Sequence, residues 1–236
     1  MNIIDLTADD RAVLAYYETH FHDRLTERAV KAANWALIEA AGGVAGGDVV
    51  DLGCGYPHDA LRGAGEARAW TLVDWCASAL TKALTVVSHA GLLVNTALVD
   101  VRALPDEWKA SFDLVLCFAT LGQVSANREL VHAEAFRVLR QGGRYCLTVP
   151  DRAHFGFEER RGPDVCGYMA TWTREGLERE LAAAGFTGRE IHGTLHAHLS
   201  AWAEKPTDMA SSAPRPGAGA PERDRSGRFK PRGARR

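Results

Sequence analysis

The sequence predicts an α/β fold organised around a parallel sheet, on the basis of three observations. Short apolar segments alternate with segments of helical spacing, which is typical of right-handed βαβ units. The apolar segment Val49-Val50-Asp51-Leu52 runs directly into the turn Gly53-Cys54-Gly55. Three of the predicted strands also end at or beside an acid, namely Asp51, Asp74 and Asp100. Because such sheets bind ligands at the carboxyl ends of their strands, these residues mark the expected site.

Two helices are expected before the first strand. Thr7-Ala8-Asp9-Asp10 has the pattern of a capping box, which opens the first helix. Apolar residues at helical spacing continue to Gly42-Gly43, which ends the second helix. We interpret the aromatic stripe of the first helix as core. The alternative is a lid over the site, lined by Tyr16, Tyr17, His20 and His22.

After the glycine turn, helices and strands continue to alternate. A short helix is expected near residues 59–61, and a second, with an apolar stripe over residues 80–87, ends at Gly91. A third begins near Ser125 or Asn127 and ends at Gly142-Gly143, where a C′ glycine would stop it. The remaining parallel strands are expected at residues 70–74, 92–99, 112–118 and 144–149.

The net charge of −2 is unevenly distributed along the chain. Residues 204–236 carry nine Lys or Arg and four Asp or Glu, a net charge of +5, which leaves −7 on residues 1–203. The end of the chain is rich in Pro, Gly and Arg and poor in apolar residues, so we expect it to be disordered. An acidic body argues against a broad nucleic-acid surface on the folded part.

The cysteine pattern favours a reducing compartment. The five cysteines are scattered and form no C-x-x-C pair, which argues against a disulfide framework and a cysteine-built zinc site. No apolar segment approaches the roughly 18 residues of a membrane span, and no secretory leader opens the chain. We therefore expect one globular domain in a soluble, cytoplasmic protein.

Five motifs follow one another in a characteristic order. They are Asp51-Leu52-Gly53-Cys54-Gly55, Leu72-Val73-Asp74, Val99-Asp100-Val101, Phe112-Asp113-Leu114-Val115 and Val138-Leu139-Arg140-Gln141-Gly142-Gly143-Arg144. This series resembles class I (Rossmann-like) S-adenosylmethionine-dependent methyltransferases over roughly residues 45–203. The segment from Thr171 to Phe186 also resembles the last helix of that family, capped by Thr173 and stopped by Gly185.

The resemblance implies the fold and the domain organisation. The fold would be a three-layer α/β/α sandwich with a seven-stranded, mostly parallel sheet whose last strand is antiparallel. Residues 188–194 and 196–203 would supply its final two strands. Residues 1–44 would form helices that cap the site, residues 45–203 the S-adenosylmethionine-binding methyltransferase domain, and residues 204–236 a disordered basic tail.

The resemblance also implies roles for individual residues. The backbone at Gly53 and Gly55 would approach the methionine part of S-adenosyl-L-methionine, and Asp51 would orient its ammonium. Asp74 would accept hydrogen bonds from the ribose hydroxyls, and Trp75 would offer a flat apolar face to the adenine. The remaining implied contacts are Asp100 and Val101 to the adenine edge, and Cys117 and Phe118 near the transferred methyl group.

Other features limit the implied site. Pro57 stands where many family members carry a third small residue, and it removes one backbone N–H from the turn. No catalytic residue can be assigned. We expect no metal. His154 is the histidine to test first, because it lies in residues 151–169, where the resemblance implies an insertion that contacts substrate. We expect the other histidines, among them His58, His196 and His198, to be surface or packing residues.

The acceptor is expected to be a small molecule, because the body is acidic and residues 151–169 are rich in aromatic side chains. Residues Cys117-Phe118-Ala119-Thr120 lack the motif with which exocyclic-amine methyltransferases hold their target nitrogen. Three alternatives remain. The first is a nucleic-acid or protein methyltransferase that is recruited by its basic tail. The second is a non-catalytic module that keeps the cofactor fold, and the third is a nicotinamide-dependent enzyme. We expect no membrane association, and the oligomeric state is open.

Overall fold

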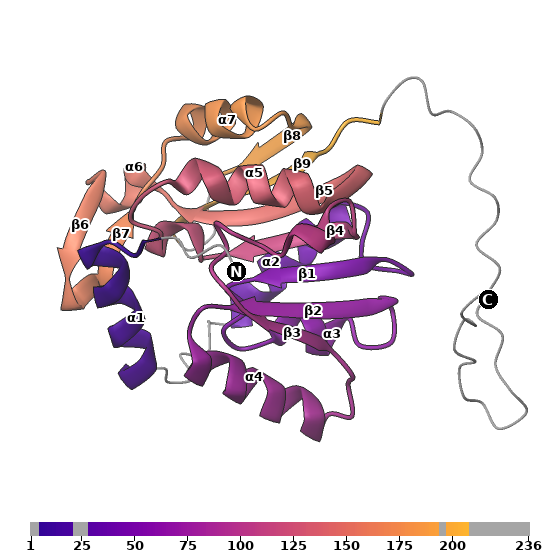
Figure 1. The fold of residues 1–236 in the computed structure, drawn as a ribbon. Helices are drawn as coiled ribbons and strands as arrows, with labels where there is room; N and C mark the ends of the chain where they lie inside the picture. The colour runs from indigo at the N-terminus through magenta and orange to yellow at the C-terminus, as the bar shows by residue number, and fades with distance from the viewer. Residues whose placement is uncertain (1–4, 21–27, 194–196, 208–236) are drawn as a thin grey trace, which may run out of the picture. The chain divides into compact units, whose positions relative to one another are not determined.

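The seven-stranded sheet at the centre of the molecule has the strand order β3-β2-β1-β4-β5-β9-β8 (Figure 1). The computed structural model describes residues 5–20, 28–193 and 197–207, and the described residues up to Pro206 form one compact unit. Five strands are parallel to one another. They are β1 (Asp48–Leu52), β2 (Ala69–Asp74), β3 (Asn95–Leu98), β4 (Phe112–Phe118) and β5 (Leu139–Pro150).

The last strand runs against its neighbours, as the resemblance implied. β9 (His198–Glu204) inserts between β5 and β8 (Thr187–His192) and is antiparallel to both. Its register places His198 beside Pro150 and Ser200 beside Thr148. The first residues of β9 therefore lie at the same edge of the sheet as the carboxyl ends of the parallel strands.

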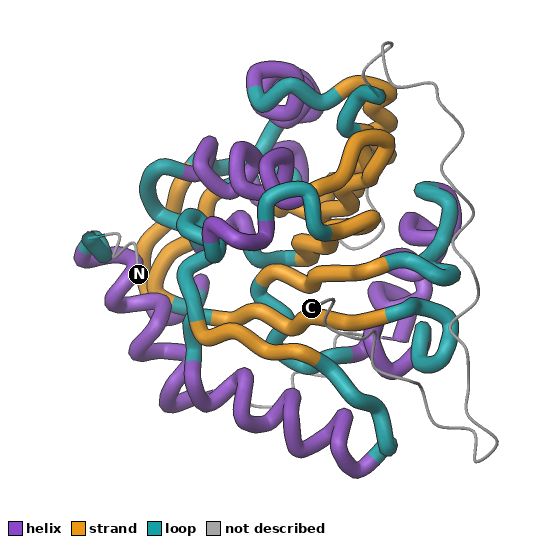
Figure 2. The backbone as a smooth tube through the Cα atoms, turned by 45° about the vertical axis from the view of Figure 1, so that its right-hand side comes forward, coloured by secondary structure: helices purple, strands orange, loops and turns teal. Residues whose placement is uncertain are grey.

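Helices cover both faces of the sheet, which gives the predicted three layers (Figure 2). One face packs against α2 (Arg28–Ala40), α3 (His58–Arg62) and α4 (Ala77–His89) through apolar side chains such as Trp35, Leu72 and Leu116. The other packs against α5 (Arg128–Val138) and α7 (Arg174–Ala183) through side chains such as Val115 and Leu177. Thr173 caps α7 as predicted, because its Oγ1 accepts a hydrogen bond from the Gly176 N–H.

Two predicted boundaries are wrong, namely the end of helix α5 and the start of strand β5, which begins at Leu139 rather than at residue 144. Helix α5 ends at Val138 rather than at Gly142-Gly143, because Leu139 already has extended backbone and pairs with Phe112 in β5. Gly142, with φ of +71°, instead turns the chain inside that strand. The connection from β3 to β4 contains the short 3-10 helix η1 (Asp106–Trp108) and no α-helix.

An N-terminal helix and an inserted hairpin lie side by side at the carboxyl edge of the sheet (Figure 1). Helix α1 (Ala8–His20) opens with the predicted capping box, in which the Thr7 N–H donates to Asp10 and the Asp10 N–H donates to Thr7 Oγ1. The inserted segment contains α6 (Arg152–Phe155), β6 (Glu159–Gly162), η3 (Pro163–Val165) and β7 (Gly167–Ala170). Another 3-10 helix, η2 (Leu121–Gln123), follows β4 and packs against β7.

Close backbone packing joins α1 to β7. Gly167 has φ of +97°, and a Cβ there would lie 3.0 Å from the Ala12 carbonyl carbon and 3.0 Å from the Val13 nitrogen. Glu18, near the other end of α1, accepts a hydrogen bond from the Ala77 N–H at the start of α4. Helix α1 thus spans from the inserted hairpin to α4 across the end of the sheet.

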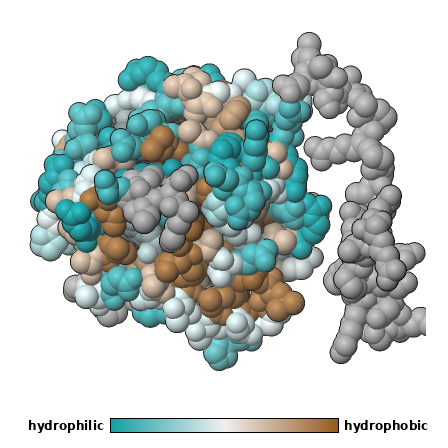
Figure 3. All heavy atoms as spheres, viewed as in Figure 1, coloured by the Kyte–Doolittle hydropathy of each residue, from teal (hydrophilic) through white to brown (hydrophobic). Residues whose placement is uncertain are grey.

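Hydrophobic atoms gather over the lower part of the face shown in Figure 3, where Figure 1 places α4. The large exposed apolar side chains among the described residues are Leu84, Leu93, Leu98 and Leu130. None of the described helices is both long and apolar enough to cross a membrane.

The close approach at Gly167 leads to a stability prediction. We expect Gly167→Ala to lower the free energy of unfolding by about 2–4 kcal/mol, since the new methyl group meets the α1 backbone and the φ angle disfavours a side chain. Gly65→Ala is the matched control, because Gly65 has φ of +84° but a Cβ there would have no other atom within 4 Å. Urea denaturation measures both; equal losses would contradict the packing argument.

Candidate functional site

A cavity of about 360 Å³ lies at the carboxyl ends of the central strands, beneath α1. Eight of the nine residues that the sequence predicted for cofactor binding line it together. They are Asp51, Gly53, Gly55, Asp74, Trp75, Asp100, Val101 and Phe118. The carboxylates that end β1 and β2 and follow β3 therefore converge on one hollow, as the sequence analysis required.

The ninth predicted residue, Cys117, does not line the cavity. Side chains alternate between the two faces of a strand. Phe118 at the end of β4 faces the cavity, so Cys117, one position earlier, points into the helix-covered core, where it is fully buried. Burial raises the pKa of its thiol to about 12. We therefore remove Cys117 from the candidate cofactor contacts.

The glycine turn after β1 contributes space rather than hydrogen-bond donors. The N–H groups of Gly53 and Cys54 both donate to the Val73 carbonyl of β2, at 2.8 and 2.9 Å. At Gly53, φ is +69° and a Cβ would lie 2.3 Å from Thr120 Oγ1. Only glycine fits between Thr120 and the cavity. The sequence analysis expected this turn to offer N–H groups to a ligand, and those of Gly53 and Cys54 are used inside the fold.

Asp74 holds the same turn in place. Its Oδ2 accepts a hydrogen bond from the Gly55 N–H at 3.1 Å, and its Oδ1 accepts one from the Cys76 N–H at 2.9 Å. Each carboxylate oxygen has two lone pairs, so both retain capacity for the hydroxyl groups of a ligand. The structure thus gives Asp74 a local role, bracing the turn, that accompanies its predicted role toward a ribose.

Three buried carboxylates give the cavity an acidic wall. Burial raises the pKa of Asp51 well above its usual value, and the neighbouring charges of Asp59 and Asp74 add to this effect. Burial likewise raises the pKa of Asp74. It raises that of Asp59, on α3, to about 6, although Arg62 and Lys31 oppose it. Carboxylates held in this way are stabilised by a cation bound among them.

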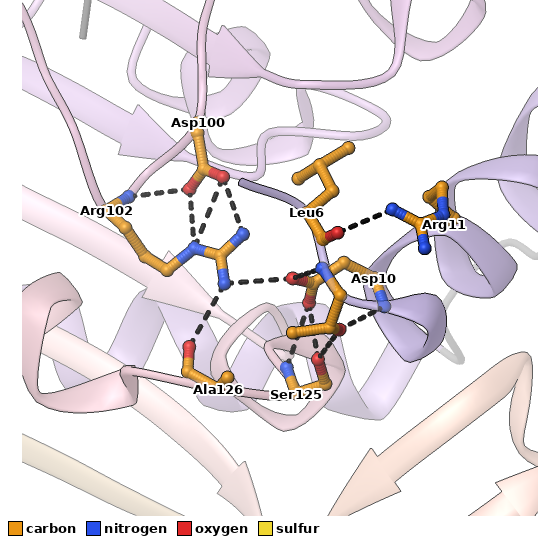
Figure 4. Close-up of polar contacts among 8 residues, drawn as sticks. Leu6, Asp10, Arg11, Asp100, Arg102, Ser125 and Ala126 are labelled. Atoms are coloured by element: carbon orange, nitrogen blue, oxygen red, sulfur yellow. Dashed lines mark hydrogen bonds and ion pairs between the residues drawn. The ribbon is translucent and has the colours of Figure 1, made fainter. Parts of the chain in front are cut away.

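Asp100 belongs to a buried ion network that reaches α1 (Figure 4). The Arg102 guanidinium lies between two carboxylates, with Nη2 2.7 Å from Asp100 Oδ2 and Nη1 3.0 Å from Asp10 Oδ2. Arg102 also donates to the Ala126 carbonyl, and Ser125 donates to Asp10. Although burial alone would raise the pKa of Asp10, hydrogen bonds from Ser125 and Thr7 and the charge of Arg102 lower it.

Several residues that line the cavity were not assigned to the site from the sequence. Tyr16 and Tyr17 of α1 line it, which matches the lid alternative for these two side chains; His22 lies outside the described residues. Other unassigned lining residues are Lys31, Asn34, His58, Asp59, Thr120, Gln123, Thr148, Cys166, His198 and Ser200. Thr120 and Gln123 lie two and five residues after the end of β4. Their place after the carboxyl end of a parallel strand was the sequence signal that could have assigned them to the site.

The histidines lie differently from the prediction. His154 on α6 is exposed and contacts Phe155, outside the cavity, so it is no longer the histidine to test first. His58 and His198 line the cavity instead. His198 reaches it because β9 is antiparallel and starts at the site edge. Across the described residues, no group of three or more His, Cys, Asp or Glu side chains is arranged to hold a metal ion.

The comparison with protein families agrees with this geometry. Residues 49–143, which run from β1 through the start of β5, match the family described as "Methyltransferase domain". The chain carries a class I S-adenosylmethionine-dependent methyltransferase domain. The protein is therefore an enzyme that uses S-adenosylmethionine as its cofactor. No curated protein matches the sequence of this methyltransferase.

Solved structures share the fold of the methyltransferase at low identity. One is the 1,6-didemethyltoxoflavin-N1-methyltransferase of Burkholderia thailandensis with bound 1,6-didemethyltoxoflavin and S-adenosylhomocysteine, at 20% identity and a TM-score of 0.65, covering 87% of this chain and 93% of that chain. Another is a possible histamine N-methyltransferase of Thermotoga maritima, at 18% identity and a TM-score of 0.60, covering 82% and 99%. The cyclase SpnF is similar too, at 20% identity and a TM-score of 0.62, covering 77% and 84%.

The chemistry of the lining residues fits the cofactor. S-adenosylmethionine carries a sulfonium and an ammonium group, and the methyltransferase lines its cavity with Asp51, Asp59 and Asp74. The bare backbone at Gly53 leaves room beside them. Trp75 and Val101 supply apolar surface at the ends of β2 and β3, where the resemblance places the adenine.

The ion network leads to a prediction about α1. We expect Arg102→Met to lower the free energy of unfolding by about 3–5 kcal/mol, because it leaves the fully buried Asp10 carboxylate without its charge partner. Arg161→Met is the control, since Arg161 pairs with Asp9 of the same helix while largely exposed; we expect little change. The double variant Asp10→Asn/Arg102→Met should recover part of the loss in urea denaturation. Similar losses of stability in Arg102→Met and Arg161→Met would contradict the role given to the buried ion network.

The pKa of Asp59 leads to a prediction about pH. An aspartate in the unfolded chain titrates near pH 4, whereas folded Asp59 titrates near 6, so the folded state holds the proton more tightly. Raising the pH from about 4 to above 6 should therefore lower the free energy of unfolding of the wild-type protein by about 3 kcal/mol, a loss that Asp59→Asn should not show. Urea denaturation of both proteins across this range measures the difference. Parallel pH profiles would show that Asp59 does not titrate in this way.

Proposed function

We propose that the enzyme transfers the methyl group to a small-molecule acceptor. The supporting observation is that the cavity continues past Phe118, from the acidic wall at β1 and β2 to Thr148, His198 and Ser200 on β5 and β9. Tyr16 and Tyr17 on α1 and Cys166 before β7 also line it. A space bounded on the sheet side and the helix side suits a small acceptor better than an extended polymer.

Within this proposal the two ends of the cavity have different tasks. The acidic end, with Asp51, Asp74 and Asp100, holds the cofactor, whose sulfonium methyl group is already electrophilic. The other end holds the acceptor so that its nucleophilic atom lies in line with that methyl group, which is the main requirement of the reaction. When the nucleophile carries a proton, that proton must leave, and His198 is the titratable side chain on β9 that lines this end.

The domain roles follow from the same proposal. Residues 1–44 cover the site, with α1 as its lid, and the domain that starts at residue 45 carries the cofactor and acceptor. The expected end of this domain at residue 203 is too early, because Glu204 belongs to β9 and Lys205 Nζ donates to the Phe136 carbonyl, so the basic tail starts at residue 207. The fold is shared with a toxoflavin-precursor methyltransferase and a possible histamine methyltransferase, whose names state small acceptors. All five cysteines are free, which suits a cytoplasmic location.

A transfer assay tests the proposal. We expect the enzyme, supplied with S-adenosylmethionine labelled in its methyl group and a metabolite extract, to place the label in the small-molecule fraction. Asp74→Ala should abolish transfer, because it removes the ribose contact and the brace on the turn at Gly55. Asp106→Ala, at an exposed position on η1, is the control and should keep full activity.

A truncated chain separates the alternatives. Removing residues 207–236 should leave transfer to small molecules unchanged. Label that appears on protein or RNA and disappears with the truncation would instead support recruitment by the tail. Absence of any transfer by an enzyme that binds S-adenosylhomocysteine would support the non-catalytic alternative.

A further inference from the structure

A second cavity of about 280 Å³ opens beside the first, inside the inserted segment. Its walls are largely apolar and include Phe155, Phe157, Val165 and Met169. The rings of Phe155 and Phe157 pack on each other, with 5.8 Å between their centroids, and both line this space. The wall also includes Arg160 and Asp164, which are exposed and pair with each other at 2.8 Å.

Gln123 and Cys166 line both cavities. Gln123 is the last residue of η2, and its backbone position is rigid. Its N–H donates to the Thr120 carbonyl at 2.9 Å, and a Cβ on the preceding Gly122 would lie 3.0 Å from Pro150 Cδ. The backbone from which the amide side chain extends is therefore held at the boundary between the two spaces.

The amide oxygen of Gln123 is buried and has no hydrogen-bond partner among the described residues. A buried carbonyl oxygen without a donor loses the hydrogen bonds that water gave it, which is unfavourable unless a ligand restores one. The geometry points to a ligand that does so while its apolar part occupies the second cavity.

We propose that Gln123 selects the methyl acceptor. The acceptor would be a small, flat aromatic or heteroaromatic compound with a ring N–H or a hydroxyl group that donates to Gln123 Oε1. Its ring would lie against Phe155 and Phe157, and the atom that receives the methyl group would face Phe118 in the first cavity. A neutral compound fits, because the one charged pair in this wall, Arg160 and Asp164, is already matched. This inference rests on the proposed function, since it names the acceptor class for the same site.

Binding of two matched probes to the enzyme saturated with S-adenosylhomocysteine tests this inference. Indole carries a ring N–H, whereas benzothiophene has nearly the same shape without a donor. We expect indole to bind wild-type enzyme about 3- to 10-fold more tightly than benzothiophene, which is the contribution of one hydrogen bond. Ligand-observed NMR titration measures both affinities without requiring methyl transfer.

The chain offers a matched control, because it has only two glutamines. Gln123→Leu should remove the preference for indole, while Gln141→Leu, at an exposed position in β5, should keep it. Gln123→Asn withdraws the amide by one methylene and should also remove the preference. It replaces Gln123→Leu in the test if that variant does not fold. Phe157→Ala should lower the affinity of the enzyme for both probes. Unchanged affinity for S-adenosylhomocysteine confirms that each variant is folded.

The possible results separate this inference from the proposed function. Equal binding of the two probes to wild-type enzyme, no binding of either, or an indole preference that survives both substitutions of Gln123 would overturn the inference. Failure of transfer to small molecules in the labelled-methyl assay would overturn the proposed function, whatever the probes show.

Discussion

The cofactor site depends most on the contacts of the Arg102 guanidinium. This group joins Asp100, which follows β3, to Asp10 on α1 and to the Ala126 carbonyl after β4. The Arg102 and Asp10 side chains are almost completely removed from water, so each charge is stable there only in the presence of the other. This network fixes α1 over the cavity and directs Asp100 at the same time. Charge as well as packing thereby holds the N-terminal helix in place.

The acidic wall places a second constraint on the fold. Asp51, Asp59 and Asp74 are all buried, and burial raises the pKa of each carboxyl. At Asp51, repulsion from Asp59 and Asp74 adds to this effect. A protein without a cationic ligand gains no stability from such an arrangement. In the proposed function, the sulfonium and ammonium groups of S-adenosylmethionine supply the compensating charge, so the instability of the wall and the affinity for the cofactor have the same physical origin.

The glycine turn and the inserted hairpin define the remaining boundaries of the site. Val73 and Asp74 use the backbone donors of Gly53, Cys54 and Gly55, and the turn is therefore rigid before any ligand binds. The hairpin fits under α1 because Gly167 allows the two backbones to meet. These two close contacts place the acidic end of the cavity next to the end proposed for the acceptor, whose lining residues come from α1, η2, β5 and β9.

The sequence by itself determined the α/β class, the helix caps at Thr7 and Thr173, and the convergence of Asp51, Asp74 and Asp100. These features follow from local periodicity, from capping and from the rule that parallel strands end at one edge. The end of α5, the orientation of Cys117 and the places of His198 and Gln123 were decided by the tertiary structure. Each depends on strand register or on contacts between segments far apart in the chain: pairing with β4 ends α5 at Leu139, and the antiparallel entry of β9 brings His198 to the site. No local pattern encodes such pairings.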